Sequence, residues 1–283
     1  MLKKGTAKGI DDYDSNGFTP LYYAVISKNL KLTKALLDKG CDINKIQGKD
    51  RTSVLYHAVD NVDVEMVKLL LKYKPDLSIK YKMKNSYSED SILGVGLYAG
   101  NIYQKKESAE VLKCLLETGC DPNAIVESED SNLTLTVLAC LTCEESKIEL
   151  LVEYGGNPFA TWKDSRFNTV YSIIRKDYKG TSISYERQNA VYRGLVKQFK
   201  GKRFVAEENL RLRNSPGLYG STVTAIKKGS KVEILDADKM EVIDDIDSCW
   251  VQVKIQAGTS DSKGEKLPEG LKGWCFLGYL KEE

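Results

Sequence analysis

Histidine is almost missing from the sequence, since His57 is the only one among 283 residues. Histidine is the side chain best suited to proton transfer near neutral pH, so its scarcity excludes many enzyme mechanisms. His57 itself falls inside a predicted helix, and no segment is left over to house a nucleophile and an oxyanion hole. No glycine-rich phosphate loop precedes a helix either. We therefore predict a structural role for His57 and no catalytic residue.

An excess of one charge sign is also missing, with 42 Lys and Arg against 40 Asp and Glu. A net charge of +2 argues against a broad nucleic-acid or anionic-lipid surface. No run approaches the roughly 18–20 apolar residues of a membrane span. The N-terminus "MLKKGTAKGIDDYDSNG" lacks the apolar segment of a secretory signal. The missing signal segment and the expected reduced thiols together favour a cytoplasmic location. If the sequence is instead a trimmed mature form, we expect the protein in the periplasm or cell envelope.

A dense disulfide framework is missing, because the seven cysteines are odd in number and dispersed along the chain. The pair Cys140-x-x-Cys143 has no second pair nearby to complete the four ligands of zinc. We expect packing thiols there, and no metal or cofactor anywhere. Cys249 and Cys275 lie in strands predicted to pair, and a disulfide between them stays open because its geometry is demanding.

What the sequence does contain is an internal period of about 34 residues, a size typical of stacked helical units. The segment "TPLYYAVISKNLKLTKALLDKGCDIN" from Thr19 aligns with "SVLYHAVDNVDVEMVKLLLKYKPDLS" from Ser53 at a constant offset. Each copy has two short segments with one apolar helical face, so each predicts a helix–turn–helix followed by an extended turn. Thr19-Pro20 fits a helix start, and Gly40 fits a helix stop. The second copy has Lys74 in place of that glycine.

The pattern resembles ankyrin repeats. Weaker copies follow in "SILGVGLYAG" with "SAEVLKCLLETGCDPN", in "TVLACLTCEESKIELLVEYGGNPF", and in a degenerate fifth, "NTVYSIIRKDY" with "YERQNAVYRGLVKQF". The resemblance covers residues 1–200 with about five repeats, of which the first and last are degenerate or capping. It implies an all-α solenoid in which neighbouring repeats cover the apolar faces that one repeat cannot bury alone.

From residue 204 the pattern changes to short alternating strands with Pro-Gly and Lys-Gly-Ser turns. The order Leu210–Arg213, Ser215–Gly217, Lys227–Val232, Trp250–Val253, Gly273-Trp274 and Tyr279-Leu280 resembles the bacterial SH3-like domain. It implies a small, bent, all-β barrel over residues 204–283, and a bacterial origin. Residues 236–248 and 256–270 are predicted to be long loops. The first is acidic but lacks the glycine of a calcium loop, so we predict a solvated loop.

The predicted fold is thus multidomain, with an all-α ankyrin solenoid (1–200) followed by an all-β SH3-like barrel (204–283). The linking segment "FKGKRFVAEEN" lacks a Gly/Ser/Pro run, so we expect the barrel to dock on the last repeat.

The resemblances imply a non-enzymatic, monomeric scaffold whose concave ankyrin face binds a protein partner. The barrel would bind a peptide or pack on the stack; the alternative is a cell-envelope protein whose barrel binds peptidoglycan. Aromatic, arginine and neighbouring side chains on exposed surfaces are the expected contacts: Phe18, Ile26, Asp60, Tyr81, Tyr87, Tyr98, Trp162, Arg166, Tyr219, Trp250 and Trp274.

Overall fold

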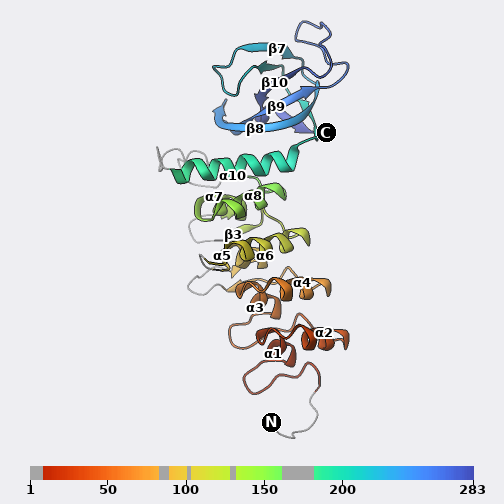
Figure 1. The fold of residues 1–283 in the computed structure, drawn as a ribbon, viewed down its shortest axis with the longest axis vertical. Helices are drawn as coiled ribbons and strands as arrows, with labels where there is room; N and C mark the ends of the chain where they lie inside the picture. Colours follow the sequence, from red (N-terminus) through yellow and green to blue (C-terminus); the bar gives the residue numbers. More distant parts are fainter. Residues whose placement is uncertain (1–8, 83–88, 101–102, 128–131, 161–181) are drawn as a thin grey trace. The chain divides into compact units, whose positions relative to one another are not determined.

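The computed structural model describes residues 9–82, 89–100, 103–127, 132–160 and 182–283. They divide into two compact units, the first ending at Leu135 and the second beginning at Thr136. This division falls inside the segment that resembles ankyrin repeats, because the last repeat helices pack with the β-structure that follows them. The sequence boundary between residues 200 and 204 stays a prediction. Figure 1 labels the helices and some of the strands.

Helix pairs form the described part of the first unit. They are α1 (Pro20–Ile26) with α2 (Leu30–Asp38), α3 (Val54–Asp60) with α4 (Val64–Lys72), and α5 (Ile92–Tyr98) with α6 (Lys105–Glu117). Short antiparallel strand pairs extend from the turns, β1 (Tyr81–Lys82) with β2 (Glu89–Asp90) and β3 (Ile125–Glu127) with β4 (Asn132–Thr134). The first helices α1, α3 and α5 pack on one another in order, and so do α2, α4 and α6.

The first helix of each pair begins at a hydroxyl cap. The side chains of Thr19, Ser53 and Ser91 accept hydrogen bonds from backbone N–H groups near the start of the helix, at 3.3, 3.1 and 3.2 Å. Each bond satisfies a donor that the helix itself leaves unpaired. Pro20 occupies the first turn of α1, where its missing N–H costs nothing. The predicted helix start at Thr19-Pro20 is confirmed.

The second helices end at residues with a left-handed backbone. Gly40 has φ +84°, and Lys74, at the equivalent position of the next repeat, has φ +53°. Lys74 therefore takes the conformation of the stop glycine although a side chain at positive φ is strained. The turn within each pair uses the same device at Lys28 and Val62, with φ of 54° and 53°. The backbone conformation thus recurs from one repeat to the next even where the residue type does not.

Burial along the first unit follows the number of neighbouring helices. On α4, which has α2 on one side and α6 on the other, Met66, Val67 and Leu70 are 0% exposed. On α2, only Thr33 and Leu37 are buried, and Leu32 is 46% exposed. The apolar face of one repeat is therefore covered by the next, as expected for a solenoid.

The second unit contains repeat helices and one β-sheet. The helices among its described residues are α7 (Leu135–Thr142), whose first residue is the last of the first unit, α8 (Glu145–Glu153) and α10 (Ser182–Phe199). Its strands are β5 (Arg203–Ala206), β6 (Leu210–Arg213), β7 (Thr222–Ile226), β8 (Lys231–Ile243), β9 (Ile246–Ile255), β10 (Lys272–Phe276) and β11 (Leu280–Glu282), with the 3₁₀ turn η1 (Leu277–Tyr279) before the last. The first helix predicted for the fifth repeat lies outside the described residues.

The sheet is antiparallel, in the order β11-β5-β8-β9-β10-β6-β7. Its residues from 203 onward are called the β-domain below. The predicted strands are confirmed, and so is the pairing of the strands that carry Cys249 and Cys275. Residues 256–270 form a connection between β9 and β10 that holds only isolated bridges, as expected.

The prediction of a long loop over residues 236–248 is wrong. This segment completes β8 and begins β9, and the two strands pair as far as Ile243 and Ile246. The turn is only Asp244-Asp245, with φ of 50° and 60°. Two consecutive positive φ values define the tight hairpin turn whose twist matches the strands, and Asp tolerates that conformation. The acidic residues therefore lie on a β-hairpin.

Helix α10 joins the repeat helices of the second unit to the β-domain. It packs on α8 and on β8. The backbone N–H of Met240 donates to the Tyr192 hydroxyl at 2.7 Å, and the rings of Phe199 and Phe204 lie 5.2 Å apart. Backbone bonds link Ile234 to Gly201 and to Lys202. These are the contacts expected of a β-domain docked on the last helix through a short connection.

An ion-pair cluster links α8 to α10. Glu149 accepts from Arg193 at 2.6 Å and from Lys197 at 2.9 Å, and Lys197 also reaches Glu153 at 3.2 Å. Burial raises the pKa of Glu149, but the hydrogen bonds from Lys197 and Arg193 outweigh it and hold the pKa below its ordinary value. A carboxylate whose pKa is lowered by folding stabilises the fold most at pH values at which it is ionised in both the folded and the unfolded state.

Glu149→Gln is therefore expected to lower the free energy of unfolding by about 1 kcal/mol at pH 7, since the two cationic partners are half exposed. The difference from the unchanged protein persists above the ordinary Glu pKa of about 4.3. It disappears as the pH falls through the lowered pKa of Glu149. Urea unfolding at a series of pH values measures it, with Glu186→Gln on exposed α10 surface as the control. A difference independent of pH would contradict the ionic role.

Candidate functional site

The last residues of α1, α3 and α5 form an exposed row. They are Ile26, which is 41% exposed, Asp60, which is exposed, and Tyr98, which is 44% exposed. Because α1 packs on α3 and α3 on α5, the three side chains occupy equivalent positions on consecutive repeats. We call this surface, together with Phe18 and Tyr23, the first-helix face. Each of the predicted contacts Phe18, Ile26, Asp60 and Tyr98 has part of its side chain open to solvent.

Aromatic rings cluster at the N-terminal end of the first-helix face. The rings of Phe18 and Tyr22 are stacked with centroids 4.1 Å apart, and Tyr23 meets both edge-on. The hydroxyl of Tyr23, which is 48% exposed, donates to Asp14 at 2.6 Å. Gly48 lies against Phe18 so closely that a Cβ there would come within 2.8 Å of the ring. These contacts fix the orientation of the exposed rings.

The same ring series continues inward through the second repeat. His57 meets Tyr22 and Tyr56 edge-on at 5.1 and 5.4 Å, and Tyr56 lies 5.2 Å from Tyr81. The Nε2 atom of His57 shares a hydrogen bond with the Thr52 hydroxyl at 2.7 Å. His57 thus connects an exposed ring cluster to a buried one, which is the structural role predicted for it.

Tyr81 corrects the predicted contact set. Its side chain is 2% exposed, and its hydroxyl shares a 2.8 Å hydrogen bond with Ser53, the cap of α3. Burial also raises the pKa of Tyr81. The ring fills the space between consecutive turns, so it has no surface to offer a partner. Tyr87, Trp162 and Arg166 lie outside the described residues.

Trp250 also corrects the predicted set. It is 3% exposed, because β9 lies at the centre of the sheet. Its indole N–H donates to Glu241 at 2.7 Å, and the guanidinium of Arg213 lies 5.9 Å from its ring. An indole with its N–H bonded and its ring covered belongs to the core. Trp250 therefore stabilises the β-domain and is not an exposed contact.

Tyr219 stands out on the β-domain because 98% of its side chain is exposed. It lies in the loop between β6 and β7, beside Leu218, which is 47% exposed. Arg213 holds the base of this loop by donating to the Gly220 carbonyl at 2.6 Å. Trp274 on β10 pairs in register with Arg213 and is partly exposed. An anchored loop thus carries two adjacent apolar side chains into solvent.

All seven cysteines carry free thiols, including Cys249 and Cys275. Burial raises the pKa of Cys140 and of Cys275 to about 12, and it also raises that of Cys249. These thiols stay protonated at neutral pH and pack as small apolar groups. Over the described ranges, no three His, Cys, Asp or Glu residues are grouped as metal ligands would be. None of the helices described has the length and apolarity to cross a membrane.

Comparisons with known proteins agree with both resemblances. A family model described as ankyrin repeats in three copies matches residues 1–85, and one described as the bacterial SH3 domain matches residues 208–281. Residues 1–85 are therefore repeats of the solenoid class. More particularly, they are ankyrin repeats, and residues 208–281 form a bacterial SH3 domain. Both kinds of domain typically bind other molecules and do not catalyse reactions.

Individual relatives share the repeats. An ankyrin repeat protein of Acanthamoeba polyphaga mimivirus is 28% identical over 163 residues, which are 57% of this chain and 19% of that protein. An ankyrin repeat protein of Fowlpox virus (strain NVSL) is 34% identical over 98 residues, 33% of this chain and 14% of that one. The chain thus spans less than a fifth of each. The solved ankyrin repeat domain of Bcl-3 is similar with 17% identity and a TM-score of 0.49, covering 66% of this chain and 75% of that one.

Proposed function

We propose that the protein is a non-enzymatic scaffold whose first-helix face binds a protein partner. The exposed row of Ile26, Asp60 and Tyr98, next to the ring cluster of Phe18, carries this proposal. Aromatic and aliphatic side chains at the centre of an interface supply most of its binding free energy. Stacked helices already hold these side chains in place, so little ordering entropy is lost on binding.

The β-domain is proposed as a second binding module. Tyr219, Leu218 and Trp274 offer apolar surface on an anchored loop and its neighbouring strand, where a peptide could pack. The match to the bacterial SH3 domain supports a second candidate, a cell-envelope protein whose β-domain binds peptidoglycan. In both candidates α10 packs on α8 and on β8, so the module is presented on a helix that is itself held in place. We propose a monomer, and domains over residues 1–200 and 204–283.

The first-helix face is tested by capture from a lysate of the source cell with the full chain as bait. Ile26→Asp with Tyr98→Asp is expected to abolish capture of the specific partner, because two charges would be buried in the interface. Tyr98→Ala alone is expected to weaken binding of the purified partner by about 2 kcal/mol, roughly thirtyfold. Isothermal titration measures the latter.

Leu32→Asp is the matched control, since Leu32 is similarly exposed but lies on α2. It is expected to leave capture intact. The interface would lie elsewhere if the partner were still captured by the Ile26→Asp, Tyr98→Asp variant but not by Leu32→Asp.

The two candidates for the β-domain are separated by sedimentation of the full chain with purified cell wall. Wall binding that Tyr219→Ala removes, with the first-helix face unchanged, would favour the peptidoglycan-binding protein. If the unchanged chain and the Tyr219→Ala variant both stay in the supernatant, the peptide-binding scaffold is favoured.

A further inference from the structure

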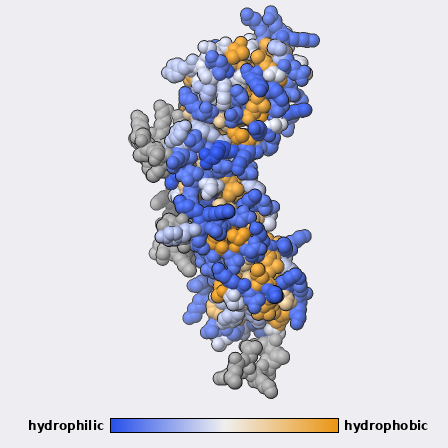
Figure 2. Space-filling view, viewed as in Figure 1, coloured by the Kyte–Doolittle hydropathy of each residue, from blue (hydrophilic) through white to orange (hydrophobic). Residues whose placement is uncertain are grey.

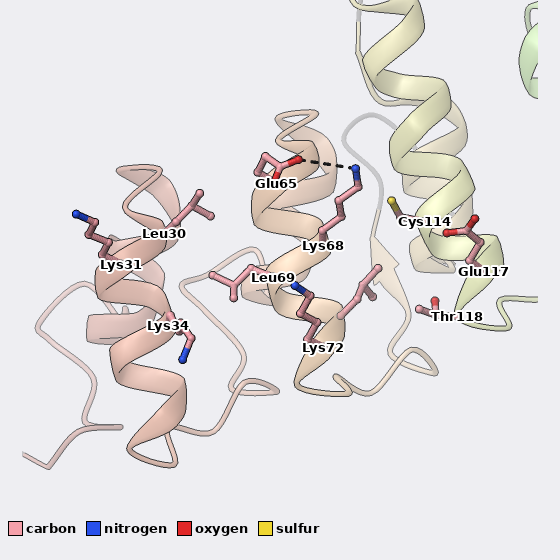
Figure 3. Close-up of a pocket in the computed structure, with 11 residues that line it drawn as sticks. Leu30, Lys31, Lys34, Glu65, Lys68, Leu69, Lys72, Cys114, Glu117 and Thr118 are labelled. Carbon is pink, nitrogen blue, oxygen red and sulfur yellow. Dashed lines mark ion pairs between the residues drawn. The ribbon is translucent and has the colours of Figure 1, made fainter.

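A shallow groove lies on the second helices of the first unit, away from the residues of the first-helix face. Its lining comes from α2, α4 and α6, and its volume is about 590 Å³. Figure 3 shows Leu30 projecting from α2 toward α4 and Leu69 projecting from α4 toward α2, with Lys72 beside Leu69 on α4. The volume falls within the range of about 300–1,000 Å³ that is typical of binding sites. We call it the outer groove.

Apolar side chains form the floor of the outer groove. Leu30 is 39% exposed, and Leu69 and Leu71 line the groove beside it. Cys114 of α6 lies at the far side with its thiol nearly buried. Figure 2 shows hydrophobic patches bordered by hydrophilic residues on the surface of the helical repeats. Leucines left open on adjacent helices favour an occupant with apolar side chains of its own.

The rim of the outer groove is basic. Four lysines and two glutamates line it, so positive charge exceeds negative by two. Lys34 is paired with Asp38, and Lys68 with Glu110. Lys31 on α2 and Lys72 on α4 make no ion pair with any residue that the structure describes. Figure 3 shows Lys31 projecting from the side of α2 that faces away from α4, so its ammonium group lies at the outer edge of the groove, while Lys72 lies on α4. A partner that crosses both helices would thus meet these two unpaired ammonium groups at separate points.

We propose that the outer groove binds an acidic amphipathic helix of a partner protein. Such a helix would lay one apolar stripe on the leucines and point Asp or Glu side chains at Lys31 and Lys72, which is the helix-in-groove mode of recognition. Packed helices lie about 8–10 Å apart, so three span about 20 Å, and a helix of about 18 residues is long enough at about 27 Å.

Charge argues against an occupant from this chain. The N-terminal residues 1–8, "MLKKGTAK", are basic, and a basic rim would repel them. The acidic stretch 236–248 is already paired in β8 and β9. The outer groove would therefore serve a second partner, independent of the one on the first-helix face.

The test uses a designed, fluorescein-labelled helical peptide of about 18 residues, long enough to cross the three helices, with leucines on one face and glutamates beside them. The second peptide has lysine at every glutamate position. Fluorescence anisotropy with the full chain is expected to show binding of the acidic peptide only, weakened by raising the salt concentration. The double variant K31E/K72E should bind it at least tenfold more weakly. K49E/K80E makes the same charge change at exposed turn residues outside the groove, and should bind within twofold of the unchanged chain.

A footprint gives the second readout. Bound acidic peptide should slow alkylation of Cys114, measured by mass spectrometry, while Cys41, which does not line the groove, reacts unchanged. Equal binding of both peptides, binding of neither, K31E/K72E binding as well as the control, or no protection of Cys114 would overturn the proposal. So would a dimer in sedimentation velocity that K31E/K72E abolishes, because the occupant would then be a second copy.

Discussion

Leu70→Ala is expected to lower the free energy of unfolding of the first unit by about 3 kcal/mol. Leu70 is 0% exposed, and its helix α4 is covered by α2 on one side and by α6 on the other. Truncation removes the transfer free energy of the lost carbons and leaves a cavity that two sets of neighbours must fill. The loss should appear as a lower urea midpoint in the helical circular dichroism signal, with the slope unchanged.

Leu32→Ala makes the same chemical change one helix pair earlier, where the leucine is 46% exposed. There we expect a change within about 0.5 kcal/mol, because water already covers the side chain. Because both variants lose the same carbons of a leucine, a difference between them reports how far neighbouring repeats cover the side chain. Similar losses for the two variants would mean that each helix pair buries its own apolar face, and the solenoid explanation would fail.

The repeat architecture can be predicted from the sequence because its signals are local and recur. Thr19-Pro20 and Gly40 mark helix ends through capping and backbone conformation, which depend on a few adjacent residues. The constant offset between copies then places those ends in the next repeat, even where Lys74 replaces the glycine. The strands of the β-domain are predictable for the same reason, since alternation is also local.

The hairpin of β8 and β9 could not be predicted in the same way. Residues 236–248 are acidic, and acidity usually marks a loop. The deciding features are the alternation that buries Met240 at 3% exposure and the ability of Asp244-Asp245 to take two positive φ values. From the sequence alone, the acidic composition of this segment is a stronger signal for a loop than these two features are for a hairpin. A turn of this type is more often signalled by Asn-Gly or Asp-Gly.

The candidate site is predicted only in part, because burial depends on tertiary contacts. Tyr81 and Trp250 are aromatic and were expected at surfaces, yet one fills the space between turns and the other lies in the central strand. Tyr23 was missed, although it is 48% exposed and adjoins Phe18. The sequence signal that could have identified Tyr23 is its position in the repeat, which is equivalent to that of His57 on α3.

The outer groove has no sequence signal at all. Its lysines lie on amphipathic helices where charged residues are ordinary, and its leucines follow the repeat pattern. Only the contacts of Lys34 and Lys68 with nearby carboxylates single out Lys31 and Lys72 as lacking an ion pair among the described residues. Surface charge becomes informative once the pairs are known.

Gly194→Ala is expected to lower the free energy of unfolding of the second unit by about 3 kcal/mol, although alanine favours a helix over glycine by about 1 kcal/mol. A Cβ at Gly194 on α10 would lie 2.8 Å from the carbonyl oxygen of Glu149 and 2.7 Å from the Cβ of Val152. One of these atoms is backbone, so α8 and α10 must separate. Since α10 also packs on β8, the change should reach the β-domain.

Tryptophan fluorescence measures this loss, because Trp250 and Trp274 lie in the second unit. Glu186→Ala on the exposed surface of α10 is the control and should change stability by no more than about 0.5 kcal/mol. Adding Val152→Ala to Gly194→Ala should not restore stability, because the Cβ of residue 152 and the carbonyl of Glu149 remain in place. Restoration by that second change, or a gain from Gly194→Ala alone, would show that the two helices are not in close backbone contact at this glycine.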